Sequence, residues 1–182
     1  MWSLPERVRA AAVVSSAPPL AEMSDRSGLL RLYRMLLSFY PRHRWLLRLS
    51  FHLARPFLSV KLPIRLRPAL LKFLQPCDAA VMRDVAAFEA CFESQRQAWR
   101  ASAEGLMADA EIYAQPWGFA LEEIQTSVRL WHGRRDRSFR WELAEAMAKR
   151  LPNCTAHFVA DEGHYSLPIR HMHEILADLK SA

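Results

Sequence analysis

The chain has 182 residues, of which 51% are hydrophobic and 24% are charged, with a formal net charge of +6 at pH 7. This length and apolar fraction allow one domain of ordinary size with a real core, which excludes a disordered chain. The three cysteines, Cys77, Cys91 and Cys154, indicate neither a disulfide framework nor a zinc site, so we expect a reducing, cytoplasmic setting and no cofactor.

The amino-terminal stretch MWSLPERVRAAAVV shows no sign of a targeting segment. It carries charges within its first ten residues and has no apolar core that ends in a cleavage site. The sequence also contains no run of about eighteen uncharged apolar residues. We therefore expect neither a signal peptide nor a membrane-spanning helix.

The first predicted strand lies in VRAAAVVSSAPP, residues 8–19. It is a short apolar run without clean alternation, which is typical of a strand buried on both faces of a parallel sheet. Pro18 and Pro19 end it. We assign residues 1–23 to this core strand and its connection.

A basic block follows the first strand. No acidic residue occurs between Asp25 and Asp78, whereas eleven of the 25 basic residues do, which leaves 14 basic and 19 acidic residues for the remainder. The leucine and aromatic spacing in LLRLYRMLLSFY and HRWLLRLSFHLARPFL indicates helices with basic faces. Residues 24–105 therefore read as a helical insertion, or cap, and the helical periodicity continues to about residue 114. Five prolines punctuate the block: Pro41, Pro56, Pro63, Pro68 and Pro76.

Residues 106–182 are expected to form a carboxyl-terminal α/β segment. SVRLWHG (127–133) and TAHFVADEGH (155–164) look like strands, and the helix candidates WELAEAMAKRL and IRHMHEILADLK follow them in turn. Alternation of strand and helix predicts an α/β fold with a parallel sheet of about three strands. In such a sheet the functional groups lie on loops at the carboxyl ends of the strands.

Two of these strand ends carry residues suited to acid–base chemistry. Asp136 follows the first strand in HGRRD, and His164 follows the second in DEGH. A neutral histidine can take a proton from a hydroxyl near pH 7, but it needs a carboxylate to fix its tautomer and to stabilise the imidazolium. Because adjacent strands lie about 4.8 Å apart, loops at neighbouring carboxyl ends can touch. The spacing is compatible with an Asp136–His164 pair.

These residues also carry a family resemblance. LWHGRRD followed by LPNCTAHFVADEGHYSL resembles the carboxyl-terminal part of the α/β-hydrolase fold superfamily. MADAEIYAQPWGFALEEIQTSVRLWHG is similar to the approach to that strand in microbial hydrolases, and LPERVRAAAVVSSAPP to the strand that follows their nucleophile helix. The resemblance implies a serine hydrolase with Asp136 as triad acid and His164 as triad base, and it puts the basic block in the position of the cap.

The nucleophile that the resemblance implies is missing from the sequence. The superfamily places its serine in a Gly-x-Ser-x-Gly elbow between a strand and a helix. Neither Ser3 nor the pair Ser15 and Ser16 fits that pattern, and the five glycines are too scattered to form it: Gly28, Gly105, Gly118, Gly133 and Gly163. We therefore read an incomplete hydrolase, inactive alone, that acts on an ester, amide or similar bond of a small apolar substrate.

The residues of the two turns also have plainer interpretations. Asp136 could cap the following helix, and His164 could be an ordinary turn residue. Glu162 is a weaker candidate for the acid, because adjacency along the chain would point it away from the imidazole. His132 is expected to pack beside the strand end. Arg134 and Arg135 are expected to face solvent. His171 and His173 are expected to lie on a solvated helix.

The sequence leaves several binding partners possible for the basic block and for the sheet. As a lid, the block would cover the pocket with leucine and aromatic side chains and favour apolar substrates. As a membrane-surface element, its arginines would meet anionic head groups. Nucleic acid ranks last, because no binding motif accompanies the charge. An unpaired sheet edge at residues 9–15 would invite association with another chain. The alternative function is a non-catalytic binding or interaction protein derived from a hydrolase.

Overall fold

The computed structural model describes residues 5–23, 26, 29–61, 63–100 and 102–182. The chain divides into two compact units. The core unit comprises Met1–Pro18, Gln75–Val81 and Trp117–Ala182, and the helical unit comprises Pro19–Leu74 and Met82–Pro116. The helical unit thus takes up most of the expected insertion, 24–105, except that residues 75–81 belong to the core unit.

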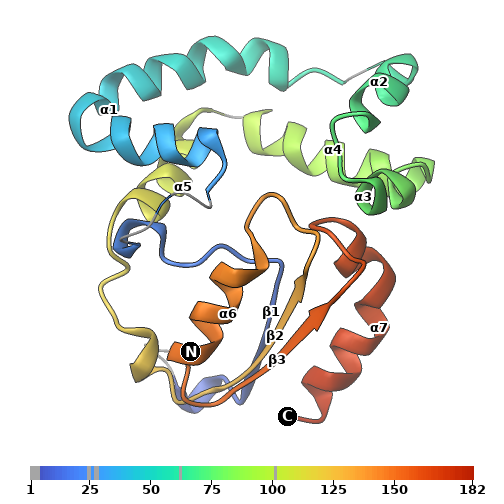
Figure 1. The fold of residues 1–182 in the computed structure, drawn as a ribbon. Coiled ribbons are helices and arrows are strands. Elements are labelled where there is room, and N and C mark those ends of the chain that lie inside the picture. The colour runs from blue at the N-terminus through green and yellow to red at the C-terminus, as the bar shows by residue number, and fades with distance from the viewer. Residues whose placement is uncertain (1–4, 24–25, 27–28, 62, 101) are drawn as a thin grey trace. The chain divides into compact units, whose positions relative to one another are not determined.

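The core unit is built on a parallel sheet of three strands in the order β1-β2-β3 (Figure 1). The strands are β1 (Ala10–Val14), β2 (Ser127–Gly133) and β3 (Cys154–Val159). Both pairings are parallel, so the carboxyl ends of all three strands lie at one edge of the sheet. The predicted α/β class with about three parallel strands is confirmed.

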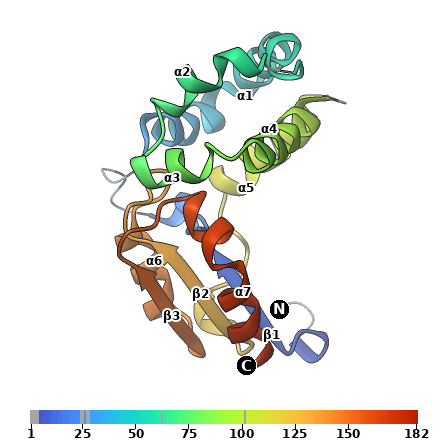
Figure 2. The same cartoon turned by 90° about the vertical axis from the view of Figure 1, so that its right-hand side faces the viewer.

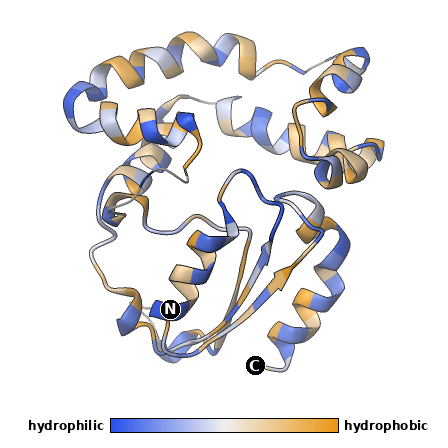
Figure 3. Ribbon diagram, in the orientation of Figure 1, coloured by the Kyte–Doolittle hydropathy of each residue, from blue (hydrophilic) through white to orange (hydrophobic). Residues whose placement is uncertain are grey.

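Helices cover both faces of this sheet (Figure 2). Val128 and Leu130 of β2 face α6 (Trp141–Arg150), and Trp131 faces α7 (Ser166–Lys180). Successive side chains of a strand point to opposite faces, so β2 buries apolar residues on both sides of the sheet. Figure 3 shows hydrophilic and hydrophobic residues mixed along α6 and α7, as expected of helices with one face on a sheet.

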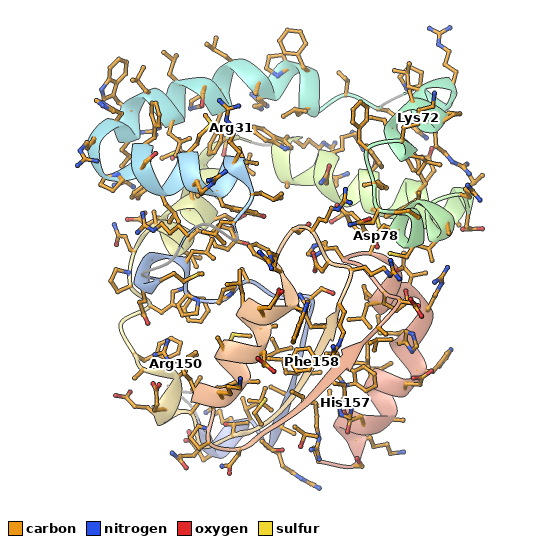
Figure 4. The ribbon with its side chains drawn as sticks, viewed as in Figure 1. Arg31, Lys72, Asp78, Arg150, His157 and Phe158 are labelled. Atoms are coloured by element: carbon orange, nitrogen blue, oxygen red, sulfur yellow. The ribbon has the colours of Figure 1, made fainter. Side chains whose placement is uncertain are left out.

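A polar cluster fastens the far end of α7 to the sheet. The indole Nε1 of Trp131 donates to Asp178 at 2.9 Å, and the ring of His157 stacks on Trp131 with centroids 4.3 Å apart. Arg129 lies 3.3 Å from the same carboxylate. His157 and Phe158, labelled in Figure 4, are adjacent on β3, and Phe158 contacts Trp141 of α6 instead.

The helical unit consists mainly of α1 (Arg31–Leu58), α4 (Val85–Arg100) and α5 (Glu104–Ala114). The expected boundary at Pro41 is displaced: helix continues past the proline, and the backbone leaves helical geometry at His43, with φ −137° and ψ 43°. The chain turns back on itself there (Figure 1). Helix also continues past Pro56, the second proline inside α1.

Part of the basic charge is used inside the helical unit. Arg44 pairs with Glu111 at 3.1 Å, and Arg48 pairs with Glu104 at 2.6 Å, so two arginines of α1 bind acidic residues of α5. Arg55 donates to two backbone carbonyls near the end of α4. The expected all-basic face is therefore partly neutralised.

Short elements complete the description: α2 (Arg67–Leu71), α3 (Pro76–Val81) and the turns η1 (Pro5–Arg7), η2 (Leu20–Glu22), η3 (Ile64–Leu66) and η4 (Leu121–Glu123). Within the described parts of the chain, no helix is long and apolar enough to cross a membrane.

Candidate active site

The turn after β2 is held tightly against the turn after β3. Arg135 donates its backbone N–H to the carbonyl of Glu162 at 2.9 Å, and Asp136 donates to the carbonyl of Gly133 at 3.1 Å. A Cβ at Gly133 would lie 2.2 Å from the Glu162 carbonyl oxygen, which is closer than atoms can approach. A glycine at this point therefore lets the two strand ends meet.

Asp136 lies buried at the centre of this contact, only 4% exposed. Its Oδ1 accepts the backbone N–H groups of Ser138 at 2.7 Å and Phe139 at 3.1 Å. An aspartate that accepts hydrogen bonds from the residues just after it forms an Asx-type turn. This turn holds the carboxyl group through Oδ1 and leaves Oδ2 available for another hydrogen bond.

Oδ2 of Asp136 meets the ring of His164. Nδ1 of His164 lies 2.8 Å from that oxygen, and because an ionised carboxylate only accepts, Nδ1 carries the proton. Nε2 is then an acceptor, and it has no hydrogen-bond partner among the described residues. The structure thus joins the two residues that the strand ends suggest, with one ring nitrogen left open to take a proton.

His132 is the second histidine of the site and is fully buried, 1% exposed. Its Nε2 donates to the carbonyl of Phe139 at 2.8 Å and lies 3.5 Å from Oδ2 of Asp136. Burial lowers the pKa of His132 below its ordinary value of 6.5, although the Phe139 carbonyl and Asp136 oppose the shift. The ring therefore stays neutral and packs beside the strand end.

Acidification is expected to weaken the fold through His132. Its pKa is below 6.5 in the folded chain, so the unfolded chain binds the proton first and stability falls as pH drops through that value. The stability advantage of wild type over His132→Gln should therefore shrink between about pH 8 and about pH 5 in urea unfolding. A difference that stays constant with pH would contradict this.

Glu162 bonds to residues of α7. It accepts from Arg170 at 3.1 Å and lies 3.5 Å from Nε2 of His171. Burial would raise the pKa of Glu162, but hydrogen bonds from Ser166 and Arg170 outweigh it and lower the pKa. The carboxylate of Glu162 thus pairs with side chains of α7. Among the described residues, no hydrogen bond or ion pair joins it to His164.

The remaining titratable residues near the site are exposed to solvent or form ion pairs. Arg134 is exposed and lies over the ring of Trp141 at 4.6 Å, and Arg135 pairs with Asp161 at 3.1 Å. His171 lies on the largely exposed helix α7, where its half-buried ring bonds Glu174 at 2.9 Å, which raises its pKa. His173 is exposed.

Ser15, at the carboxyl end of β1, is the one described non-glycine residue with a positive φ, 47°. Its N–H donates to the carbonyl of Trp131 at 2.9 Å. Its hydroxyl is buried and has no hydrogen-bond partner within the described chain. No hydrogen bond joins Ser15 to His164 in the described structure, so the two are not arranged as nucleophile and base. The described residues also contain no group of three or more side chains placed to hold a metal.

Comparison with known proteins identifies the fold. No protein-family model matches the chain, and no curated protein does so either. Among solved structures, a bromoperoxidase from Bacillus anthracis is similar with a TM-score of 0.59 and 15% identity, over 97% of this chain and 59% of its own.

Two further solved structures are similar over nearly the whole of this chain. A 2-hydroxy-6-oxo-6-phenylhexa-2,4-dienoate hydrolase from Rhodococcus has a TM-score of 0.54 and 18% identity, over 100% of this chain and 58% of its own. An α/β-hydrolase fold protein from Chitinophaga pinensis has a TM-score of 0.51 and 15% identity, over 99% and 59%. The chain has the α/β-hydrolase fold, as its motifs predict, and it spans 58–59% of the length of these structures.

Proposed function

We propose that the chain is the acid–base portion of a serine hydrolase, with Asp136 as the acid and His164 as the base. The observation that carries the proposal is the 2.8 Å hydrogen bond between Nδ1 of His164 and the buried Asp136 carboxylate. The same bond fixes the tautomer in which Nε2 is free to accept a proton. His132, Glu162 and His171 are committed to other partners.

The reaction would be acyl transfer to a serine hydroxyl. Nε2 of His164 takes the hydroxyl proton as the serine oxygen attacks the substrate carbonyl carbon, and the carbonyl electrons move to its oxygen. The imidazolium then gives this proton to the leaving group as the tetrahedral intermediate collapses. Asp136 stays ionised throughout and stabilises the imidazolium. Water then attacks the acyl carbonyl carbon while Nε2 of His164 takes its proton, and this proton passes to the serine oxygen as the acyl–serine bond breaks and the acid product leaves.

The serine is proposed to come from outside these 182 residues, together with the strands that carry it. The sequence contains no Gly-x-Ser-x-Gly elbow. In the described sheet β1 pairs on one side only, with β2, and all five of its apolar residues are half-buried. An apolar strand with an open edge is a ready site for a further strand. We propose that the polypeptide that supplies the nucleophile pairs there.

A cavity in the helical unit is evidence for a small apolar substrate. The helical unit contains an open cavity of about 600 Å³, a size that suits a small molecule. The cavity lies between α1, α4 and α5, and its walls are mostly leucine and aromatic side chains, including Leu36, Phe39, Phe51, Trp99 and Tyr113. A cap with such an interior would bind an alkyl or aryl group more readily than a charged one.

Fluorophosphonate labelling tests the proposed function. The chain alone should not be labelled, whereas a longer gene product with an in-frame elbow before Met1 should be labelled at the elbow serine. His164→Gln in that product should slow labelling by about 10³-fold or more, because the base is lost. Labelling of the chain alone, in a manner abolished by Ser15→Ala, would overturn the proposal, as would an unlabelled longer product.

The second candidate is a non-catalytic binding protein whose basic block lies on an anionic surface. The observation in its favour is a row of large exposed apolar side chains along α1: Trp45, Leu49, Leu53 and Phe57. A helix of that kind can sink its apolar side chains into a membrane interface while its arginines meet head groups. An unlabelled longer product would leave this candidate in place.

A further inference from the structure

Asp78 is a buried acid that the acid–base pair does not use. It lies on the short helix α3 and is 4% exposed (Figure 4). In the sequence it is the first acidic residue after a long basic stretch, yet in the described structure no lysine, arginine or histidine side chain pairs with it. A buried carboxylate without a cation is costly unless hydrogen bonds satisfy it. The donors that it accepts from therefore indicate its role.

All of its partners are backbone N–H groups of the turn that carries the base. Oδ2 of Asp78 accepts from His164 at 3.2 Å, and Oδ1 accepts from Tyr165 at 2.9 Å and Ser166 at 2.8 Å. These three consecutive groups lead into α7, whose first N–H groups have no partner within the helix. Charge-assisted hydrogen bonds of this kind are stronger than neutral ones, so the turn is held firmly.

Gly163 makes the close approach possible. A Cβ at this position would lie 2.5 Å and 2.6 Å from the two carboxylate oxygens of Asp78. The Gly163 N–H is in turn bonded to the hydroxyl of Ser166 at 2.8 Å. The Asp78 carboxylate therefore requires a glycine at position 163. Any side chain there would displace either the carboxylate or the turn that carries His164.

We propose that Asp78 is a positioning residue for His164. One carboxylate, Asp136, holds the imidazole through Nδ1, and a second, Asp78, holds the backbone from which that imidazole projects. With both in place the ring has one position, with Nε2 open. Without Asp78 the backbone of residues 164–166 loses its acceptors, and the ring no longer stays on Asp136. This proposal rests on the role proposed for His164.

Proton NMR of the ring tests the positioning directly. An Nδ1 proton held by a carboxylate gives a sharp, far-downfield signal, which wild type should show. Asp78→Asn offers an amide N–H where the His164 N–H needs an acceptor, so the signal should broaden or vanish. Gly163→Ala keeps the charge but pushes the carboxylate away, and it should have the same effect. A wild-type signal in both folded variants would overturn the proposal.

Two control variants separate positioning from general loss of stability. Asp178→Asn loosens the far end of α7, where it removes the charge bonded to Trp131. Asp84→Asn weakens an ordinary helix cap in the helical unit, where Oδ1 accepts from the N–H of Ala87 at 2.8 Å. Both should reduce stability and leave the downfield signal sharp. If either broadens it as much as Asp78→Asn does, Asp78 has no special role.

Amide exchange in wild type gives a readout that needs no variant. The N–H groups of residues 164–166 should exchange about a hundredfold more slowly than unprotected amides, because each is bonded to a buried carboxylate. Exchange at the unprotected rate would overturn the proposal even if no variant folds. None of these measurements needs the nucleophile, so they can fail or succeed separately from the labelling experiment.

Discussion

Gly133→Ala is expected to lower the free energy of unfolding by about 3 kcal/mol. The added Cβ would lie 2.2 Å from the carbonyl oxygen of Glu162 and 2.7 Å from that of Gly163. Both are backbone atoms, which cannot rotate aside as the end of a side chain can. The turn after β2 must therefore separate from the turn after β3, which would break the Arg135 to Glu162 hydrogen bond. Urea unfolding followed by circular dichroism measures the loss.

Gly105→Ala is the matched control. Gly105 lies in the first turn of α5, and a Cβ there would meet nothing within 4 Å. Alanine is the better helix former, so this variant should gain up to about 1 kcal/mol. Equal stability of wild type and Gly133→Ala would show that the two strand ends are farther apart than the structure has them.

Asp136→Ala is expected to cost about 3 kcal/mol, and Asp136→Asn much less. Alanine leaves the N–H groups of Ser138 and Phe139 and the Nδ1–H of His164 without their acceptor. Asparagine can still accept the two backbone groups through its Oδ1. Its amide nitrogen then faces Nδ1 and can only donate, so His164 must move its proton to Nε2.

The tautomer change is the sharper result, because it removes the open acceptor that a base needs. Nitrogen-15 chemical shifts of the ring should show Nδ1–H in wild type and Nε2–H in Asp136→Asn. Asp161→Asn is the control: its pair with Arg135 is exposed on both sides, so it should alter stability by no more than about 0.5 kcal/mol and leave the tautomer unchanged. An unchanged tautomer in Asp136→Asn would contradict the relay.

The sheet could be predicted because its signals are local. The segment SVRLWHG, 127–133, resembles a strand that ends in a glycine, and β2 has those bounds. The run at 8–19 and the segment 155–164 extend beyond β1 and β3, because both include the turn residues that follow each strand. Parallel strand order then places Asp136 and His164 at the same edge, which the chain order alone implies.

Other parts depend on contacts that no local pattern records. Asp78 is separated from its partner Ser166 by 88 residues, and in the sequence it reads as one more residue of a helical stretch. The close packing of Gly133 depends on a carbonyl that belongs to the next strand's turn. In the sequence, His171 looks like a surface residue of a helix. In the structure its ring lies 3.5 Å from the carboxylate of Glu162, which precedes the helix.

The seven residues 75–81 belong to the core unit, although the residues before and after them belong to the helical unit. They interrupt the helical unit, so that what reads in the sequence as one insertion consists of two separate excursions, Pro19–Leu74 and Met82–Pro116. Such a block cannot be excised or transplanted as a single module. A deletion that spans it would also remove Asp78, which accepts the backbone N–H groups of His164, Tyr165 and Ser166. Any engineered splice across this region has to keep those seven residues as a third junction.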